Sequence, residues 1–467
     1  QEWISQKIIE VSCLVSYKKH LWVGTHGSGL YRLTTDLKQY EKPLSLKQSK
    51  IITTLYSPDT SKLYIGTMHH GGFIIKNQEL LQHLNAEQGL SNNHVKSFLV
   101  DQWGGLWIGT SGGGLQKYVG SHFKHMTRKN GIHGDFVYSV YKDQQEQLWL
   151  GTENGFQKQT DTGWVYFDQH HQFSNTKVKC FYESPEGTMW VGTDGKGLIQ
   201  VAQDTAGQDS LIFYTTKDGL SSNWIRDIIY HPVENRIYIA TLGGGLTIAQ
   251  RAIVDSSVQI QFKKLKDPNM PARINQMALD QKGRIWLATD NEGLLYWINE
   301  IQAPAGNENL ASTRIRSLTF GQKHLWIGTA TKGLFEVNTH SEYLRVTPKS
   351  WNTQLTSSNI YQVLLSQDST LWIGSEKGLD KITNPTGKEV QINHFGYNDG
   401  FTGLETCQNA VFEDSLGRIY FGTISGLEIY SDKEVEISAD PPKIQLKDVL
   451  LFYQPISKAN HESFSYD

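Results

Sequence analysis

One stretch of the chain, LWIGTSGGGLQKYV at residues 106–119, returns many times with small changes. Each copy places Trp or Tyr after a first apolar residue, and a turn that contains glycine follows. The aromatic positions lie 40 to 48 residues apart, at Trp22, Tyr64, Trp107, Trp149, Trp190, Tyr238, Trp286, Trp326, Trp372 and Tyr420. A repeat of this length with several short strands is typical of the blades of a β-propeller. The sequence therefore predicts an all-β fold built from ten blade repeats.

Each repeat is predicted to form a four-stranded antiparallel sheet. In the copy around Trp107, runs of β-branched and aromatic residues predict strands at residues 95–100, 106–110, 115–119 and 122–127. One large flat ring per repeat suits the wedge between neighbouring sheets. We therefore expect Trp107 and its nine equivalents to be buried between blades, as part of the scaffold.

The number of rings is a separate question. Ten repeats can form one ten-bladed ring, a seven-bladed ring with an incomplete partner, or two small rings. No linker or change of composition divides the repeats, so a single large ring is favoured over two smaller rings. Residues 1–8 are then expected to complete the last blade or to pack against it.

Charge and cysteine content narrow the functional classes. The chain has 467 residues, and its 44 basic and 47 acidic side chains give a net charge of −3. This balance gives no support for nucleic-acid binding. Three cysteines, Cys13, Cys180 and Cys407, are too sparse for a disulfide framework. No apolar run reaches the roughly 18–20 residues that span a bilayer, and the first residues do not resemble a signal peptide.

The repeat GLSNNHVKSFLVDQWGGLWIGTSGGGLQKY, residues 89–118, resembles the two-component regulator propeller repeat. The resemblance covers residues 1–436, and it implies that they form the β-propeller repeat array. Residues 437–467, which contain ADPPKIQLKDVLLFYQPI, are similar to the first strands of the immunoglobulin-like β-sandwich domain that follows the propellers in this family. That domain is expected to continue past Asp467, toward a membrane segment absent from this chain. Many members have two seven-bladed rings, and ten repeats depart from that pattern.

In this family the propellers form the periplasmic sensor regions of hybrid histidine kinases and of some diguanylate cyclases, and many members sense glycans. The resemblance therefore implies an extracytoplasmic ligand-sensing domain that passes a signal to a cytoplasmic kinase or cyclase. No catalysis by this chain itself is expected. A homodimer through the C-terminal domain would also fit this interpretation.

Ligand-binding residues are expected at the mouth of the propeller funnel, where the turns before the inner strands converge. The residues directly before the inner strands are His94, Phe136, Lys177, Trp224, Arg273, Arg314 and Asn359. Cations beside aromatic rings suit an anionic ligand, with acidic or sulfated oligosaccharides as the natural class. A ligand that contacts Lys177, Trp224, Arg273 and Arg314 would touch four neighbouring blades.

Three other interpretations stay open. The basic residues can instead pair with carboxylates of neighbouring blades. The chain can be a scaffold that binds a protein partner, or a propeller glycoside hydrolase or polysaccharide lyase. Candidate acids Asp135, Asp227 and Glu405 come from different blades without a recurring partner, which argues against hydrolysis. The pairs His69–His70 and His170–His171 are adjacent and would point to opposite faces of a strand, so neither a metal nor another cofactor is expected.

Overall fold

The structure is a computed structural model, and it divides the chain into two compact units. One unit comprises residues 1–120 and 436–467, and the other comprises residues 121–435. The residues that the structure describes are 10–34, 40–41, 50–59, 61–76, 79–86, 89–101, 105–118, 122–167, 175–203, 209–254, 257–310, 313–321, 323–432, 450–451 and 454–455.

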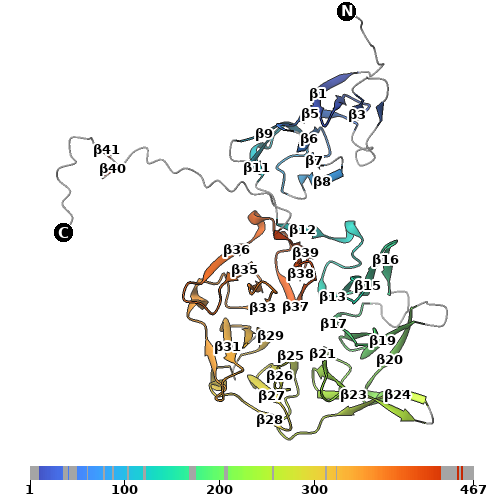
Figure 1. The fold of residues 1–467 in the computed structure, drawn as a ribbon, viewed down its shortest axis with the longest axis vertical. Coiled ribbons are helices and arrows are strands. Elements are labelled where there is room, and N and C mark those ends of the chain that lie inside the picture. The colour runs from blue at the N-terminus through green and yellow to red at the C-terminus, as the bar shows by residue number, and fades with distance from the viewer. Residues whose placement is uncertain are drawn as a thin grey trace, which may run out of the picture. The chain divides into compact units, whose positions relative to one another are not determined.

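Residues 121–435 form a closed ring of seven four-stranded antiparallel sheets, the seven-blade unit (Figure 1). The strands nearest the axis, called the inner strands, are β13 (Val137–Lys142), β17 (Val178–Glu183), β21 (Ile225–His231), β25 (Ile274–Leu279), β29 (Ile315–Phe320), β33 (Ile360–Leu365) and β37 (Thr406–Glu413). The second strands are β14 (Leu148–Thr152), β18 (Met189–Thr193), β22 (Arg236–Thr241), β26 (Ile285–Thr289), β30 (His324–Thr329), β34 (Leu371–Ser375) and β38 (Ile419–Thr423).

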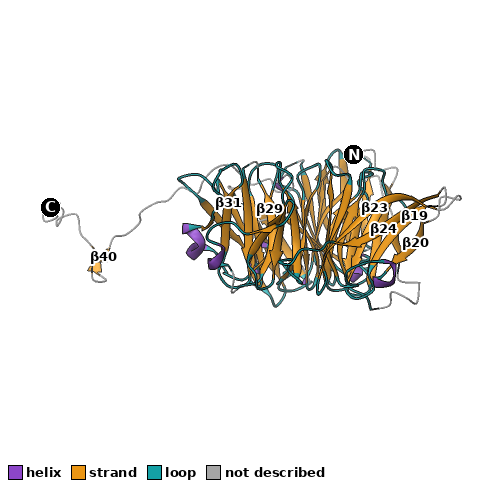
Figure 2. Ribbon diagram, turned by 90° about the horizontal axis from the view of Figure 1, so that it is seen from below, coloured by secondary structure: helices purple, strands orange, loops and turns teal. Residues whose placement is uncertain are grey.

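The outer half of each blade completes the sheet, and loops cover both ends of the strands (Figure 2). The third strands are β15 (Gly155–Thr160), β19 (Leu198–Gln203), β23 (Gly245–Val254), β27 (Leu294–Trp297), β31 (Leu334–Asn338), β35 (Gly378–Thr383) and β39 (Gly426–Tyr430). The outer strands are β16 (Gly163–Tyr166), β20 (Asp209–Tyr214), β24 (Ser257–Lys264), β28 (Ile301–Gln302), β32 (Val346–Pro348), β36 (Gln391–Phe395) and β12 (Phe123–Met126).

The ring is closed by β12, which lies first in the sequence of this unit but forms the outer strand of its last blade. Phe123 pairs with Tyr430 and Met126 with Leu427, so β12 is antiparallel to β39. The ring of Phe123 also packs edge-on against Phe401, with 5.5 Å between the ring centroids. The last blade therefore takes three strands from the end of the unit and one from its beginning.

The other unit contains three blades and is called the three-blade unit. Its strands are β1 (Val11–Tyr17), β2 (His20–Thr25), β3 (Leu30–Leu33) and β4 (Tyr40–Glu41); β5 (Ile52–Tyr56), β6 (Lys62–Thr67), β7 (Gly72–Lys76) and β8 (Glu79–Leu84); and β9 (Val95–Val100), β10 (Leu106–Thr110) and β11 (Gly114–Tyr118). The third of these sheets has three strands in the described part of the chain.

The all-β propeller fold is as predicted, but the expected single ten-bladed ring is wrong. The segment at residues 122–127, predicted to be the outer strand of the blade around Trp107, pairs with β39 instead and closes a ring of seven blades. The arrangement of a seven-bladed ring with an incomplete partner is the one observed. Residues 1–8, expected to complete the last blade, lie outside the described residues, and β12 holds that position.

The repeat aromatics pack each blade onto the blade that follows. Fully buried Trp286, for example, lies among Ile315 and Ile327 of the next blade. Tyr420 of the last blade packs in the same way against Val137 and Leu150 of the first blade, which confirms that the ring is closed. Since the buried clusters each join two neighbouring blades, the hydrophobic core is divided among the interfaces between blades.

Nine of the ten aromatic positions are buried as predicted, and Trp107 is the exception. Trp107 lies in the last blade of the three-blade unit, and no further blade within the described part of that unit covers its sheet. Leu99 and Leu115 of the same blade are 57% and 67% exposed. The indole N–H of Trp107 still donates to Asp101 at 2.9 Å, as Trp149 donates to Asp143 at 2.8 Å.

The immunoglobulin-like domain predicted for residues 437–467 stays a prediction, because most of this segment lies outside the described residues. There the structure describes one antiparallel pair, β40 (Leu450–Leu451) with β41 (Gln454–Pro455). Within the described residues, no helix has the length and apolar character needed to cross a membrane.

Two substitutions within the three-blade unit test the packing rule. Trp22, 2% exposed, lies against the next blade, and Trp22→Ala is expected to lower the free energy of unfolding by about 3–5 kcal/mol. Trp107→Ala is expected to cost roughly 1–2 kcal/mol, because a partly exposed ring loses less buried surface. Chemical denaturation of both variants measures the difference, and equal losses would contradict the rule.

Two fragments test ring closure by β12. A fragment of residues 121–435 is expected to unfold cooperatively, since it contains all seven blades. A fragment of residues 127–435 lacks β12, and its melting temperature is expected to be lower by roughly 10 °C or more. Lys124→Ala in the longer fragment is the control, because this β12 side chain is exposed. Equal melting temperatures for the two fragments would show that β12 does not hold the ring closed.

Candidate functional site

The glycine turns between second and third strands link neighbouring blades at one end of the ring. Gly195 and Gly197 both donate their backbone N–H groups to the carbonyl of Asn223 in the next blade, at 3.0 and 2.9 Å. Gly197 has a φ of +84°, and a Cβ there would lie 2.1 Å from the carbonyl oxygen of Tyr214. This position therefore requires glycine, and the repeated glycine has the scaffold role that the sequence predicts.

The residues directly before the inner strands of the seven-blade unit, called the mouth residues, are Phe136, Lys177, Trp224, Arg273, Arg314, Asn359 and Glu405. The same turns hold them, since the N–H groups of Asp194 and Leu242 donate to the carbonyls of Lys177 and Trp224, each at 2.9 Å. Mouth residues and glycine turns thus share one end of the ring.

Four of the predicted site residues, Lys177, Trp224, Arg273 and Arg314, lie at the mouth in four consecutive blades. Trp224 is 49% exposed, and Phe136 in the preceding part of the ring is 39% exposed. His94 holds the equivalent position before β9, but it belongs to the three-blade unit. Partial burial, helped by Lys96 and His69, lowers the pKa of the His94 imidazole.

One buried carboxylate neutralises part of the charge that the sequence places at the mouth. Arg314 Nε lies 2.8 Å from Asp290 Oδ1, and Arg273 Nη1 lies 3.5 Å from Asp290 Oδ2. Asp290 is 5% exposed, whereas the two arginine side chains are 61% and 49% exposed for Arg273 and Arg314. The interpretation as ion pairs between neighbouring blades therefore holds for Arg314, whereas Arg273 pairs with Asp290 of its own blade. Two guanidinium groups sharing one carboxylate still keep one net positive charge.

Most of the acidic residues at the mouth were not predicted from the sequence. They follow the second strands directly, at Glu153, Asp194, Asp290 and Glu376. Asp194 pairs with Arg226 at 2.9 Å, and Glu153 accepts the N–H of Phe136 at 3.0 Å. The signal in the sequence is the acidic residue that follows Gly-Thr, Ala-Thr or Gly-Ser in these repeats. The mouth is therefore less basic than predicted.

A second layer of side chains lies two residues after the mouth residues, where each inner strand has a β-bulge. In β17, for example, Val178 pairs with Thr193 and Cys180 with Gly192, so Lys179 is left as an extra residue. The equivalent residues in the six regular inner strands are Tyr138, Lys179, Arg226, Asn275, Arg316 and Tyr361. A bulge re-aims the side chain of its extra residue. We call these six the bulge residues.

The seventh inner strand carries a larger bulge that reaches across the axis. On β37, four residues, Cys407–Ala410, stand opposite the single residue Gly422 of β38. Gln408 donates to the carbonyl of Arg316 at 3.2 Å, and Asn409 donates to the carbonyl of Asn275 at 3.4 Å. These partners belong to β29 and β25, two and three blades away, which only a segment inside the axial channel can reach. We call residues 407–410 the axial bulge.

Two of the bulge residues are cations that lie on tyrosine rings. Lys179 Nζ is 3.7 Å from the centroid of the Tyr138 ring, and the Arg316 guanidinium is 4.2 Å from that of Tyr361. Burial lowers the pKa of Lys179 to about 8, against the opposing effect of Asp194. Burial also raises the pKa of Tyr138 to about 12.

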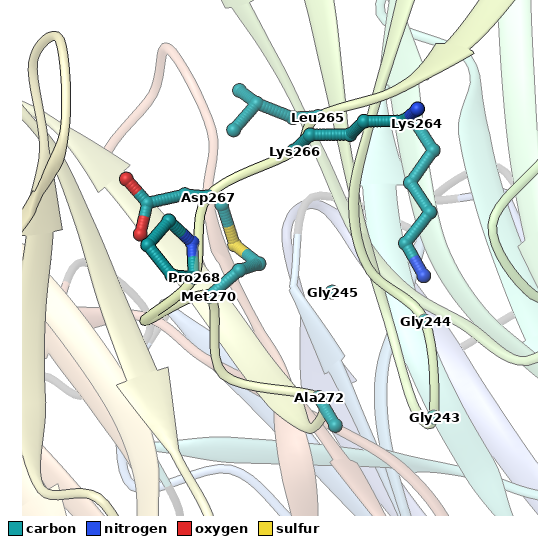
Figure 3. Close-up of a pocket in the computed structure, with 10 residues that line it drawn as sticks. All are labelled: Gly243, Gly244, Gly245, Lys264, Leu265, Lys266, Asp267, Pro268, Met270 and Ala272. Carbon is teal, nitrogen blue, oxygen red and sulfur yellow. The ribbon is translucent and has the colours of Figure 1, made fainter.

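A groove of about 460 Å³ adjoins the mouth beside Arg273 (Figure 3). It lies between the turn Gly243–Gly245 and the loop from Lys264 to Ala272, and Met270 and Pro268 form an apolar wall. In Figure 3 the Lys264 side chain extends along the groove, with its amino group toward the glycine turn. The groove joins the mouth because Gly243 donates to the carbonyl of Ala272, the residue before Arg273, at 2.7 Å.

The candidate acids are not brought together as a catalytic pair. Asp135 pairs with Arg128 at 3.1 Å, and Asp227 accepts the N–H groups of Met277 at 2.7 Å and Ile228 at 2.9 Å. Glu405 is a mouth residue on the last blade. In the part of the chain that the structure describes, no three His, Cys, Asp or Glu side chains form a group able to hold a metal ion. His170 and His171 lie outside that part.

The model of the family described as two component regulator propeller matches residues 89–112, 131–154 and 172–195. The chain carries two-component regulator propeller repeats. The first matched segment lies in the three-blade unit and the other two in the seven-blade unit. None of the curated proteins compared with the chain matches it.

Solved structures with the same fold include two from B. thetaiotaomicron. The extracellular domain of BT3049, described as a hybrid two-component system, has a TM-score of 0.70 and 20% identity over 96% of this chain and 61% of its own. That of BT4673, described in the same terms, has a TM-score of 0.55 and 20% identity over 98% of this chain and 63% of its own. The chain thus spans about three fifths of the length of these relatives.

A third solved structure is PorZ of Porphyromonas gingivalis, described as a surface component of the type-IX secretion system. Its TM-score is 0.50 at 12% identity, over 92% of this chain and 69% of its own. Identities this low show a shared propeller fold, and the function of this chain has to be argued from its own residues.

The partly buried acid Asp227 predicts a pH effect on stability. Burial raises its pKa to about 7, from 3.8 for an exposed carboxyl. Its stabilising contribution is therefore complete below about pH 4 and is lost as the pH rises to about 7, on the order of 2–4 kcal/mol. Asp227→Asn is expected to remove this part of the pH dependence in chemical denaturation, whereas exposed Asp161→Asn serves as the control. Identical pH profiles for the Asp227→Asn variant and the parent would contradict the assignment.

Proposed function

We propose that the chain is the ligand-sensing region of a periplasmic signalling receptor, and that the seven-blade unit binds an anionic oligosaccharide at its mouth. One observation supports this above the others. Lys177, Trp224, Arg273 and Arg314 present exposed side chains on four consecutive blades, and the groove of Figure 3 adjoins them. A single extended ligand can contact all four.

The chemistry of these side chains suits an acidic sugar. Trp224 offers a half-exposed flat ring on which a pyranose can stack, and it lies against Gly195. Arg273 and Arg314 share Asp290 and keep one net positive charge, and Lys177 adds another. Guanidinium groups hold carboxylate or sulfate oxygens in a bidentate geometry. In the groove, Lys264 and Lys266 add two further cations.

The proposed signalling role is inferred from proteins with similar structures. BT3049 and BT4673 are described as hybrid two-component systems, and their extracellular domains have this propeller fold. By analogy, binding at the mouth passes a signal to a cytoplasmic kinase or cyclase, and this region performs no catalysis. A purely structural scaffold for a protein partner would not need exposed cations and an aromatic ring around one mouth.

A panel of oligosaccharides tests the binding. Uronate-containing or sulfated members are expected to raise the melting temperature of the protein, and neutral members of equal length are not. The double variant Arg273→Ala/Arg314→Ala is expected to weaken binding about tenfold or more, because charge-assisted contacts are worth roughly 1.5–3 kcal/mol. Affinity is also expected to fall as salt is raised. Isothermal titration calorimetry measures both effects.

Arg236→Ala/Arg251→Ala is the matched control, since both of these exposed arginines are paired with glutamates away from the mouth, at Glu234 and Glu186. Unchanged affinity in the Arg273/Arg314 variant would contradict binding at the mouth. Release of shorter sugars during incubation, read by mass spectrometry, would contradict a non-catalytic role.

A further inference from the structure

Polar atoms without a partner among the described residues gather near the axis of the seven-blade unit. Nε and Nη1 of Arg316 are buried and have no hydrogen-bond acceptor among the described residues. Oδ1 of the mouth residue Asn359 and Oδ1 of Asn409 in the axial bulge are also buried, and within the described chain they have no donor. Leaving such groups unpaired costs free energy, so a cluster of them points to a ligand.

The two cations on tyrosine rings also lack a dedicated counter-ion. Among the described residues, no carboxylate lies within 4.0 Å of the Lys179 amino group or of the Arg316 guanidinium. Asp194 is the acid that acts on Lys179, but its carboxylate is paired with Arg226 at 2.9 Å. A charge removed from water without a partner is expensive, and an aromatic ring repays only part of that cost.

The axial bulge lies near both of these residues. Cys407 lies within electrostatic range of Lys179, whose charge counteracts part of the rise in the thiol pKa that burial causes. The next residue, Gln408, donates to the carbonyl of Arg316. Gln362 fixes the bulge through hydrogen bonds to the carbonyls of Cys407 at 2.6 Å and Ala410 at 2.9 Å. Lys179 and Arg316 therefore flank a rigid segment inside the channel.

We propose that the acidic group of the ligand enters the axial channel below the mouth and binds over the axial bulge, with Lys179 and Arg316 as its counter-ions. The ligand class is a sugar that carries a carboxylate or a sulfate group. Asn359 and Asn409 offer acceptors for its hydroxyl groups. This inference rests on the proposed function for the identity of the ligand, but the anion site itself can be tested without a sugar.

The first test uses sodium sulfate on the full chain, with sodium chloride at equal ionic strength as the reference. Sulfate is expected to raise the melting temperature beyond the chloride value. Lys179→Met and Arg316→Met remove the positive charge and keep an unbranched apolar side chain, and each is expected to weaken sulfate binding tenfold to a hundredfold. Lys124→Met, at an exposed side chain of β12, is the matched control and should respond like the parent. Equal responses of the parent to sulfate and chloride, or parent-like responses of both channel variants, would overturn the site.

The second test measures the affinity of the parent protein for sulfate as a function of pH. Sulfate keeps its charge between pH 7 and 9, so its affinity should fall in this range as Lys179, with a pKa of about 8, loses its proton. Of the groups around Lys179, Tyr138 and Cys407 have pKa values raised to about 12. The other charged groups that act on Lys179 are Lys177, Arg226 and Asp194. The fall should be absent in Lys179→Met, and a parent affinity independent of pH would overturn the role of Lys179.

A third comparison separates this inference from the proposed function. If acidic oligosaccharides bind and depend on Arg273 and Arg314 but not on Lys179 and Arg316, the mouth binds the ligand and the channel site is wrong. If sulfate binding depends on Lys179 and Arg316 while no acidic oligosaccharide binds, the channel site holds and the proposed ligand is wrong.

Discussion

The pairing of β12 with β39 decides the architecture of the seven-blade unit. Without it, the last blade would have three strands and Phe123 would lose its place beside Tyr430. With it, Tyr420 packs against Val137 and Leu150, so the last and first blades meet as any other neighbours do. A closed ring leaves every inner strand beside two others and creates the axial channel. The mouth, the bulge residues and the axial bulge all exist only because this ring closes after seven blades.

The blade structure could be predicted from the sequence because it depends on residues that are close together in the chain. The period of the aromatic residues, the glycine turns and the strand runs around Trp107 each lie within one repeat, and the structure confirms them. Ring closure could not be predicted in this way. The segment at Phe123–Met126 has the same strand character whether it pairs with β11 or with β39, and the choice depends on a partner about 300 residues away. The prediction that Trp107 is buried was wrong for the same reason, because its burial depends on a following blade.

The candidate site was predicted in part. Reading the residue before each inner strand found Lys177, Trp224, Arg273 and Arg314, and the structure places them side by side in the ring. The carboxylates that pair with the arginines were not predicted, because Asp290 follows a second strand and meets Arg314 only across an interface between blades. The axial bulge was not predicted either, since the three extra residues in β37 are visible only once Thr406 and Val411 are aligned with their partners. Charge balance in a ring depends on residues from several blades at once.

The two layers of the funnel differ in how their charges are balanced, and this difference determines where an anion is most strongly held. At the mouth, arginines are half exposed and share a carboxylate, so water and Asp290 already stabilise them. In the channel, Lys179 and Arg316 are more deeply placed, and tyrosine rings take the place of acids. The same anion gains more where the dielectric is lower and the counter-charge is missing. A ligand with one acidic group therefore orients itself, since its charge is drawn to the bulge residues while its sugar rings remain at the mouth beside Trp224.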